Sequence, residues 1–282
     1  GQVSADGWHA YFPTVFVVKE QLASLILIVI ALIYSFFRIT KSILEKSRWP
    51  RFLGWIWQHF SEFSALAFII FYWFTSLRSP LNIGFRHLLP TLPLTYLLVA
   101  YEIKKWWRGE YRQFFLSRWT EIKYHFKKFG GLLLKTLIIA VLLIWYLTET
   151  VSIAPNFIAY FNELVGGAKN GYKYVVDSNL DWGQDLKKLA KFANQNKINK
   201  IKVDYFGGGS PKYYLGDKFE PWSSSKGQPE ANSWLAVSLT FLQNSQGQPA
   251  PGFERKPEES YSWLKDKKPF ERIGYSIFIY KF

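Results

Sequence analysis

Two adjacent side chains, Arg86 and His87, have the chemistry to hold a phosphate group. A guanidinium is a planar fork that matches phosphate oxygens, and a helix N-terminus also attracts anions. Both residues lie just before Pro90, at the start of an apolar run where a lipid phosphate headgroup would lie. An arginine that snorkels to the membrane interface beside a packed histidine explains the same residues equally well.

Lys19 is the third candidate ligand for a lipid phosphate. It lies with Glu20 at the outer end of the first apolar run. A charge at the centre of a membrane costs about 2.5–3.5 kcal/mol on insertion scales and less near the edge. Neighbouring residues do not face each other on a helix, so Lys19 could point into a helix bundle toward an anion. Snorkelling to the interface is the alternative.

A polar string further along the chain could bind a sugar or a peptide by hydrogen bonds and aromatic stacking. Its members are Asp177, Asn179, Asp181, Trp182, Gln184 and Asp185. The alternating oxygen ligands resemble a calcium loop, but the sixth position is Trp182 rather than Gly and the twelfth is Lys188 rather than Glu. A purely structural role is the alternative, since Asp181 and Gln184 have the spacing of a helix capping box.

The glycine-rich turn and the histidines give weaker evidence of a functional site. The Gly207–Gly209 turn lacks the spacing of a dinucleotide-binding loop and a Walker lysine, which indicates a simple turn. The histidines have no metal-ligand spacing and are His9, His59, His87 and His125. We therefore predict no metal site within this chain.

Four apolar runs approach the roughly 20 residues that a membrane-spanning helix needs. They cover residues 13–37, 61–77, 87–101 and 132–153. The third run is short and contains Pro90 and Pro93, which kink a helix. A re-entrant or interfacial segment is the alternative for that run.

Basic residues between these runs predict the orientation of the chain. Between the third and fourth runs lie Lys104, Lys105, Arg108, Arg112, Arg118, Lys123, Lys127 and Lys128. The loop after the first run is also basic and carries Arg38, Lys41, Lys46, Arg48 and Arg51. Because Lys and Arg accumulate on the cytoplasmic side, both loops are predicted inside. Arg86 and everything after about residue 155 are then extracytoplasmic.

The predicted fold is thus a multi-pass membrane region at 1–154 followed by a soluble α/β domain with a small mixed sheet at 155–282. Within the second part we expect a helix at 181–194 and a short helix opened by Ser210 and Pro211. The expected strands cover residues 172–176, 201–206, 234–241 and 273–280.

Composition limits the classes of function. The chain has 282 residues and a formal charge of +14, but much of the excess lies in the two loops that positive-inside topology explains, so nucleic acid is not an expected partner. Aromatic residues make up 20%, which suits membrane interfaces and sugar-stacking surfaces. There is no Cys, which excludes disulfides and thiolate metal sites in this sequence. There is also no Met, so residue 1 is not a translation start; we expect it to lie within a longer protein, and a processing site is the alternative.

Several segments resemble a known family. They are Gly7–Pro13, Asn82–Pro93, Tyr160–Gly167, Asn170–Tyr172, Asp177–Leu186 and Arg272–Ser276. The chain looks like the C-terminal half of bacterial membrane glycosyltransferases related to protein O-mannosyltransferases and aminoarabinose transferases, which have the GT-C fold. The Asp177–Asp185 string is the most specific part of this resemblance.

This resemblance implies an enzyme of the bacterial cytoplasmic membrane that moves a sugar from a polyprenyl-phosphate donor to an extracytoplasmic protein or glycan. It implies that Arg86, His87 and Lys19 hold the donor phosphate. The family's catalytic carboxylate lies in the first outer loop, and nothing here matches it, since Asp6 precedes what looks like a late helix. We expect the carboxylate, and most ligands of a divalent metal, in a missing N-terminal half.

Two other functions are compatible with the sequence. The first is a non-catalytic, membrane-anchored protein whose outer domain binds a glycan or peptide or acts as a sensor. The second, a transporter subunit, is disfavoured because no charged residue lies in the middle of an apolar run.

Overall fold

A computed structural model describes residues 7–44, 54, 56–82, 84–109, 118–247, 249, 254, 256 and 260–282. The chain folds into two compact units. The sheet unit contains Gly1–Lys19, Leu77–His87 and Ile153–Phe282, and the helix unit contains Glu20–Ser76 and Leu88–Ser152. Both units are therefore assembled from separate stretches of chain, whereas the predicted membrane and soluble parts meet once, at residue 154.

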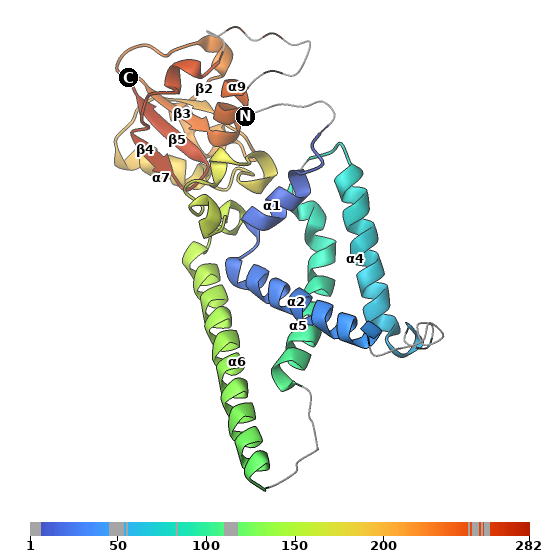
Figure 1. Cartoon of the computed structure of the whole chain (residues 1–282). Helices are drawn as coiled ribbons and strands as arrows, with labels where there is room; N and C mark the ends of the chain where they lie inside the picture. The colour runs from blue at the N-terminus through green and yellow to red at the C-terminus, as the bar shows by residue number, and fades with distance from the viewer. Residues whose placement is uncertain are drawn as a thin grey trace. The chain divides into compact units, whose positions relative to one another are not determined.

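Long helices make up the helix unit (Figure 1). They are α2 (Leu22–Leu44), α4 (Phe60–Arg78), α5 (Leu92–Arg108) and α6 (Arg118–Ile153). Three of them contain segments long and apolar enough to cross a membrane, namely Leu22–Thr40, Phe60–Arg78 and Glu121–Ile153. At 1.5 Å per residue, the 36 residues of α6 extend about 54 Å, beyond the ~30 Å of a bilayer core.

Apolar side chains of α6 are largely exposed. Leu142 is buried, whereas Leu137, Val141, Ile144 and Leu147 each expose more than half of their surface. A soluble helix would bury such a stripe against its own core. The apolar surface of α6 is thus compatible with insertion into lipid.

Two predicted runs differ from the structure. The first run is broken at Glu20 and Gln21, so that α1 (Tyr11–Lys19) belongs to the sheet unit and α2 to the helix unit. The third run begins as a 3₁₀ helix, η1 (Phe85–Thr91), and only then becomes α5. Prolines explain the second change, because a proline is accommodated in the first turn of a helix but not in its interior. Arg112 and Lys46–Arg51 of the basic loops lie outside the described residues.

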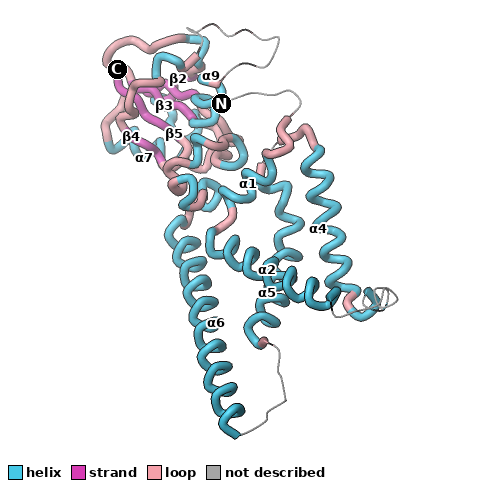
Figure 2. The backbone as a smooth tube through the Cα atoms, in the orientation of Figure 1, coloured by secondary structure: helices cyan, strands magenta, loops and turns pink. Residues whose placement is uncertain are grey.

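The sheet unit contains a mixed five-stranded sheet in the order β2-β1-β3-β5-β4 (Figure 2). The strands are β1 (Ile201–Asp204), β2 (Phe219–Pro221), β3 (Trp234–Ser238), β4 (Glu271–Ile273) and β5 (Ile277–Lys281). Strand β1 runs parallel to β2 and β3, while β5 is antiparallel to β3 and β4. A small mixed sheet is what the sequence predicts.

Helices cover both faces of this sheet. On one face, Leu235, Val237 and Phe278 pack with Leu239 and Leu242 of α9 (Leu239–Gln246). The opposite face packs against α7 (Leu186–Gln195) and α8 (Pro211–Leu215) through the cluster Leu186, Leu189, Ala193, Ile201, Val203, Leu215, Ala236 and Ile279. Successive residues of β3 and β5 point to opposite faces, as the pleat requires.

Details of the sheet unit correct four expectations. Residues 172–176 form no strand: Tyr172 and Lys173 belong to the 3₁₀ turn η4 (Gly171–Lys173), and the rest is a turn and irregular chain. The helix expected at 181–194 begins at Leu186, because Gly183 has a φ of 86° that no helix tolerates. The strand expected at 273–280 is a hairpin turned at Gly274, and β3 ends at Ser238, where α9 follows.

The short helix expected at Ser210 and Pro211 is confirmed. Ser210 is the N-cap of α8, and its side chain accepts a hydrogen bond from the backbone N–H of Tyr213. Pro211 begins the helix, where its missing N–H costs nothing.

Candidate functional site

The polar string identified from the sequence lies beside the carboxyl ends of the parallel strands. Phe206 follows β1, and its backbone N–H donates a hydrogen bond of 2.9 Å to the Ser238 hydroxyl at the end of β3. The Phe206 ring lies against Trp182, with 6.4 Å between ring centroids. In open α/β sheets, ligands bind at the carboxyl edge of the strands. The loop therefore lies where this architecture places sites.

Asn179 connects three parts of the sheet unit. Its Oδ1 accepts a hydrogen bond from the backbone N–H of Phe85 at 2.8 Å, and its Nδ2 donates to the Tyr11 hydroxyl at 2.9 Å. Its backbone carbonyl accepts a hydrogen bond from Lys19. Asn179 is only 2% exposed, so this buried amide ties α1 and the Arg86 loop to the polar string.

Lys19 is held at the base of this arrangement. Its Nζ donates to the carbonyl oxygens of Ile158 at 2.7 Å and Asn179 at 2.6 Å, and lies 4.4 Å from the Phe161 ring centroid. Two of its three N–H donors are thus used within the protein. One donor remains for an anion, which makes Lys19 mainly a support for the loop.

Arg86 lies over the indole of Trp182, with 4.9 Å from the guanidinium carbon to the ring centroid. Its Nε is 3.5 Å from Nε2 of His87, at the outer limit of a hydrogen bond. Arg86 is exposed, and among the described residues no carboxylate forms an ion pair with it. The stacking orients the guanidinium and leaves its terminal N–H groups available. The sequence placed Arg86 and Trp182 in separate motifs, and the structure brings them together.

Asp181 lies beneath the loop with no exposed surface. Its Oδ1 accepts a hydrogen bond from the backbone N–H of Gly183 at 2.8 Å, while Oδ2 has no hydrogen-bond partner among the described residues. The Ser238 and Ser276 hydroxyls lie nearby and lower its pKa, although neither has hydrogen-bond geometry to Oδ2. Burial is the largest effect on the Asp181 carboxyl and raises its pKa. The Gly183 N–H lowers the pKa and the Asp185 charge raises it, with a net value of about 6.

Asp185 has a structural role. Its Oδ2 accepts hydrogen bonds from the backbone N–H groups of Tyr275 and Ser276 and from the Ser276 hydroxyl, at 3.0, 3.2 and 2.9 Å. Its Oδ1 pairs with Lys188 at 2.7 Å. Asp185, rather than Asp181, precedes the first residue of α7. A side chain at Gly274 would collide with this carboxylate, since a Cβ at that position would lie 2.1 Å from its oxygen atoms.

The remaining members of the string have local partners. Oε1 of Gln184 accepts a hydrogen bond from the backbone N–H of Trp182 at 2.8 Å, and its amide donates to the Leu180 carbonyl. The expected capping box between Asp181 and Gln184 is therefore wrong, because both side chains close the turn that precedes the helix. Asp177 has a left-handed backbone, with φ of 58°, and its N–H donates to the Thr240 hydroxyl.

The Gly207–Gly209 turn packs against the same loop. A Cβ at Gly207 would lie 2.6 Å from the Cα of Gly183, so the two backbones approach closely because neither residue has a side chain. Sequence reasoning missed Phe206, Ser238 and Ser276. Polar residues that follow apolar strands, such as Ser238, are the signal that could have found them.

The residues do not fit a bound metal. Within the part of the chain that the structure describes, no three His, Asp or Glu side chains converge. Asp185 uses both carboxylate oxygens in hydrogen bonds, and only one oxygen of Asp181 is without a partner. We therefore derive no step through a metal in this chain.

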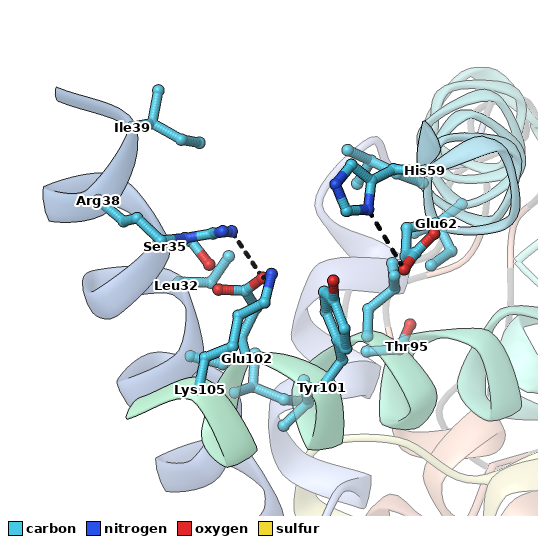
Figure 3. Close-up of a pocket in the computed structure, with 16 residues that line it drawn as sticks. Leu32, Ser35, Arg38, Ile39, His59, Glu62, Thr95, Tyr101, Glu102 and Lys105 are labelled. Atoms are coloured by element: carbon cyan, nitrogen blue, oxygen red, sulfur yellow. Dashed lines mark hydrogen bonds and ion pairs between the residues drawn. The ribbon is translucent and has the colours of Figure 1, made fainter. Parts of the chain in front are cut away.

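A hollow of ≈ 400 Å³ lies within the helix unit (Figure 3). Its walls are apolar, and charged side chains of α2, α4 and α5 gather along it. Arg38 and Lys105 approach Glu102 at 2.7 and 3.4 Å, and His59 lies 3.7 Å from Glu62. The basic side chains named here already have acidic neighbours, so this hollow is less suited to bind a phosphate than the exposed Arg86.

Comparison of the chain with protein-family models, with curated proteins and with solved structures finds no match.

Proposed function

We propose that this chain forms the C-terminal part of an integral-membrane glycosyltransferase of the GT-C type. The enzyme would transfer a sugar from a polyprenyl-phosphate carrier to an extracytoplasmic protein or glycan, at the bacterial cytoplasmic membrane. The observation that carries this proposal is the exposed Arg86 guanidinium, stacked on Trp182 and without an acidic partner among the described residues.

Arg86 has the geometry of a phosphate ligand. Stacking on an indole fixes the plane of the guanidinium and lowers the entropy lost when its N–H groups bind oxygen atoms. When the sugar leaves its carrier, the lipid phosphate gains negative charge, which a fixed cation stabilises. His87 and the remaining donor of Lys19 would support the same group.

The helix unit supports a membrane-facing donor. Its three apolar helices are compatible with insertion, and we include α5 as a fourth crossing. Arg38 follows the first residue of α2 by 16 positions, about 24 Å of helix, whereas Lys19 lies three residues before that helix begins. Since the basic loops after α2 and α5 would face the cytoplasm, Lys19 and Arg86 would lie near the outer leaflet.

One observation favours the second candidate, a membrane-anchored glycan- or peptide-binding protein. Asp181 is fully buried and Asp185 is 1% exposed, so neither carboxylate can touch a substrate. The transferase proposal accounts for this by placing the catalytic carboxylate in another part of the protein.

Transfer from a polyprenyl-phosphate-linked sugar by the full-length protein tests the proposal. Loss of one charge-stabilising group costs roughly 10²–10³-fold in turnover, so Arg86→Ala should lower kcat by that factor. Arg86→Lys should retain part of the activity, because an ammonium keeps the charge but not the planar fork.

Arg78→Ala is the matched control, since Arg78 is an exposed arginine near the same loop. It should leave turnover within about twofold. Unchanged turnover in Arg86→Ala would remove this residue from the mechanism, and absence of transfer by the wild-type protein would favour the binding protein.

A further inference from the structure

A cleft in the sheet unit is separate from the Arg86–Trp182 contact. It has a volume of ≈ 310 Å³, at the lower end of the ~300–1,000 Å³ of small-molecule sites. Its lining comes from the Gly7–Tyr11 segment, Asn82, the Tyr172–Asp177 segment and α9. Asp177 is the only member of the polar string in this lining.

Contacts within the unit hold the walls in place. The backbone N–H of Trp8 donates to Oδ1 of Asn82 at 3.4 Å, and the Tyr11 hydroxyl accepts a hydrogen bond from Asn179. The Tyr172 ring packs edge-on against Phe278, with centroids 5.4 Å apart. The cleft is thus built from segments of the sheet unit that are far apart in the sequence.

Helix α9 supplies the amide wall. It buries Leu239, Leu242 and Ser245 against the sheet, which leaves Gln243 and the exposed Asn244 along the cleft. Segment η4, which begins the opposite wall, contacts α9 directly.

The chemistry of the lining combines flat aromatic faces with neutral hydrogen-bonding groups. Trp8 is 45% exposed and Tyr174 is 54% exposed, so their rings are accessible to a ligand. The polar side chains are mostly amides, and among the described residues of the lining the formal charges of Lys173 and Asp177 cancel. Aromatic faces accept the apolar face of a sugar ring, while amides and a carboxylate bind its hydroxyls.

We propose that this cleft binds an uncharged saccharide. A phosphate-rich or acidic ligand would require more than the one lysine of the described lining, and an acyl chain would make no use of its amide and carboxylate groups. Where the transferase proposal holds, on which this further step rests, the saccharide is the acceptor or the sugar portion of a glycosylated acceptor.

The test uses the intact chain in detergent, applied to an array of neutral and acidic oligosaccharides and to a peptide array. The strongest oligosaccharide ligand is then titrated by calorimetry. We expect retention on neutral oligosaccharides. Tyr174→Ala should weaken binding roughly tenfold, because an aromatic contact is lost. Asp177→Asn, which the left-handed backbone tolerates, should weaken binding in a folded protein.

Tyr214→Ala is the matched control, because Tyr214 is 43% exposed on α8 and lies outside the cleft. It should bind within about twofold of the wild type. Retention on acidic oligosaccharides alone, on peptides alone or on neither array would overturn the inference, as would equal affinities of the Tyr174→Ala and Tyr214→Ala proteins.

The two proposals fail differently. If the protein transfers no sugar but binds neutral oligosaccharides through Tyr174, only the transferase proposal fails. If it transfers sugar and Tyr174→Ala leaves the KM for the acceptor unchanged, only the cleft inference fails. A rise in acceptor KM with an unchanged donor KM is the result expected when both hold.

Discussion

The helix unit and the sheet unit place the same kinds of side chain in opposite surroundings. Ile144 of α6 is 63% exposed, whereas Ile279 of β5 is fully buried. Asp185 is buried with four hydrogen-bond contacts, whereas Arg38 and Glu102 pair along a hollow between helices. The sheet unit is organised around its own core and polar network, and the helix unit presents apolar surface that lipid would cover.

The largest expected effect concerns the network of the sheet unit. Asp185→Ala leaves the buried N–H groups of Tyr275 and Ser276 without an acceptor, which should lower the free energy of unfolding by roughly 3–5 kcal/mol. Thermal unfolding followed by tryptophan fluorescence measures this. Asp217→Ala, an exposed aspartate of the same unit, should change stability by less than about 0.5 kcal/mol. Equal losses in the two variants would mean that Asp185 does not organise the unit.

Placing an aspartate at one exposed position in each unit compares the surroundings of the two units directly. Ile144→Asp places a charge in the apolar part of α6 and should raise the free energy of membrane insertion by about 2.5–3.5 kcal/mol. Tyr213 is even more exposed, at 82%, yet Tyr213→Asp should cost less than about 0.5 kcal/mol. Insertion of α6 can be scored with engineered glycosylation sites, and stability with thermal unfolding. Normal insertion of the Ile144→Asp helix would contradict a lipid-facing position.

The smallest effect concerns Asp181, whose pKa is raised from 3.8 to about 6. The folded state then binds more protons than the unfolded state between these values, so stability should fall as pH rises from about 4 to 6 and level off above. The fall amounts to at most about 3 kcal/mol. Asp181→Asn should remove this dependence and raise the unfolding temperature at pH 8. An Asn variant with the same pH profile as the wild type would show that another group titrates.

Hydropathy and local turn chemistry predicted some of the elements, whereas long-range contacts could not be predicted. Apolar runs predicted α2, α4 and α6 because a long run of apolar residues without regular polar positions is typical of a membrane-spanning helix. The Ser210–Pro211 signal predicted α8 because a cap acts locally. Asn179 was found as part of a polar string, but its bonds to Phe85 and Tyr11 span 94 and 168 residues. No local spacing encodes such pairs.

Sidedness is the central claim, because Arg86 can meet a lipid-linked donor only if the sheet unit faces the extracytoplasmic compartment. Residues 1–282 contain no cysteine, so the substitutions Tyr213→Cys in the sheet unit and Lys127→Cys in α6, both at exposed positions, add one labelling site each, and the unsubstituted protein measures the background. In intact cells, a membrane-impermeant maleimide should label Tyr213→Cys, and should label Lys127→Cys only after the membrane is permeabilised. Labelling of Lys127→Cys alone in intact cells would place the sheet unit in the cytoplasm and contradict the account.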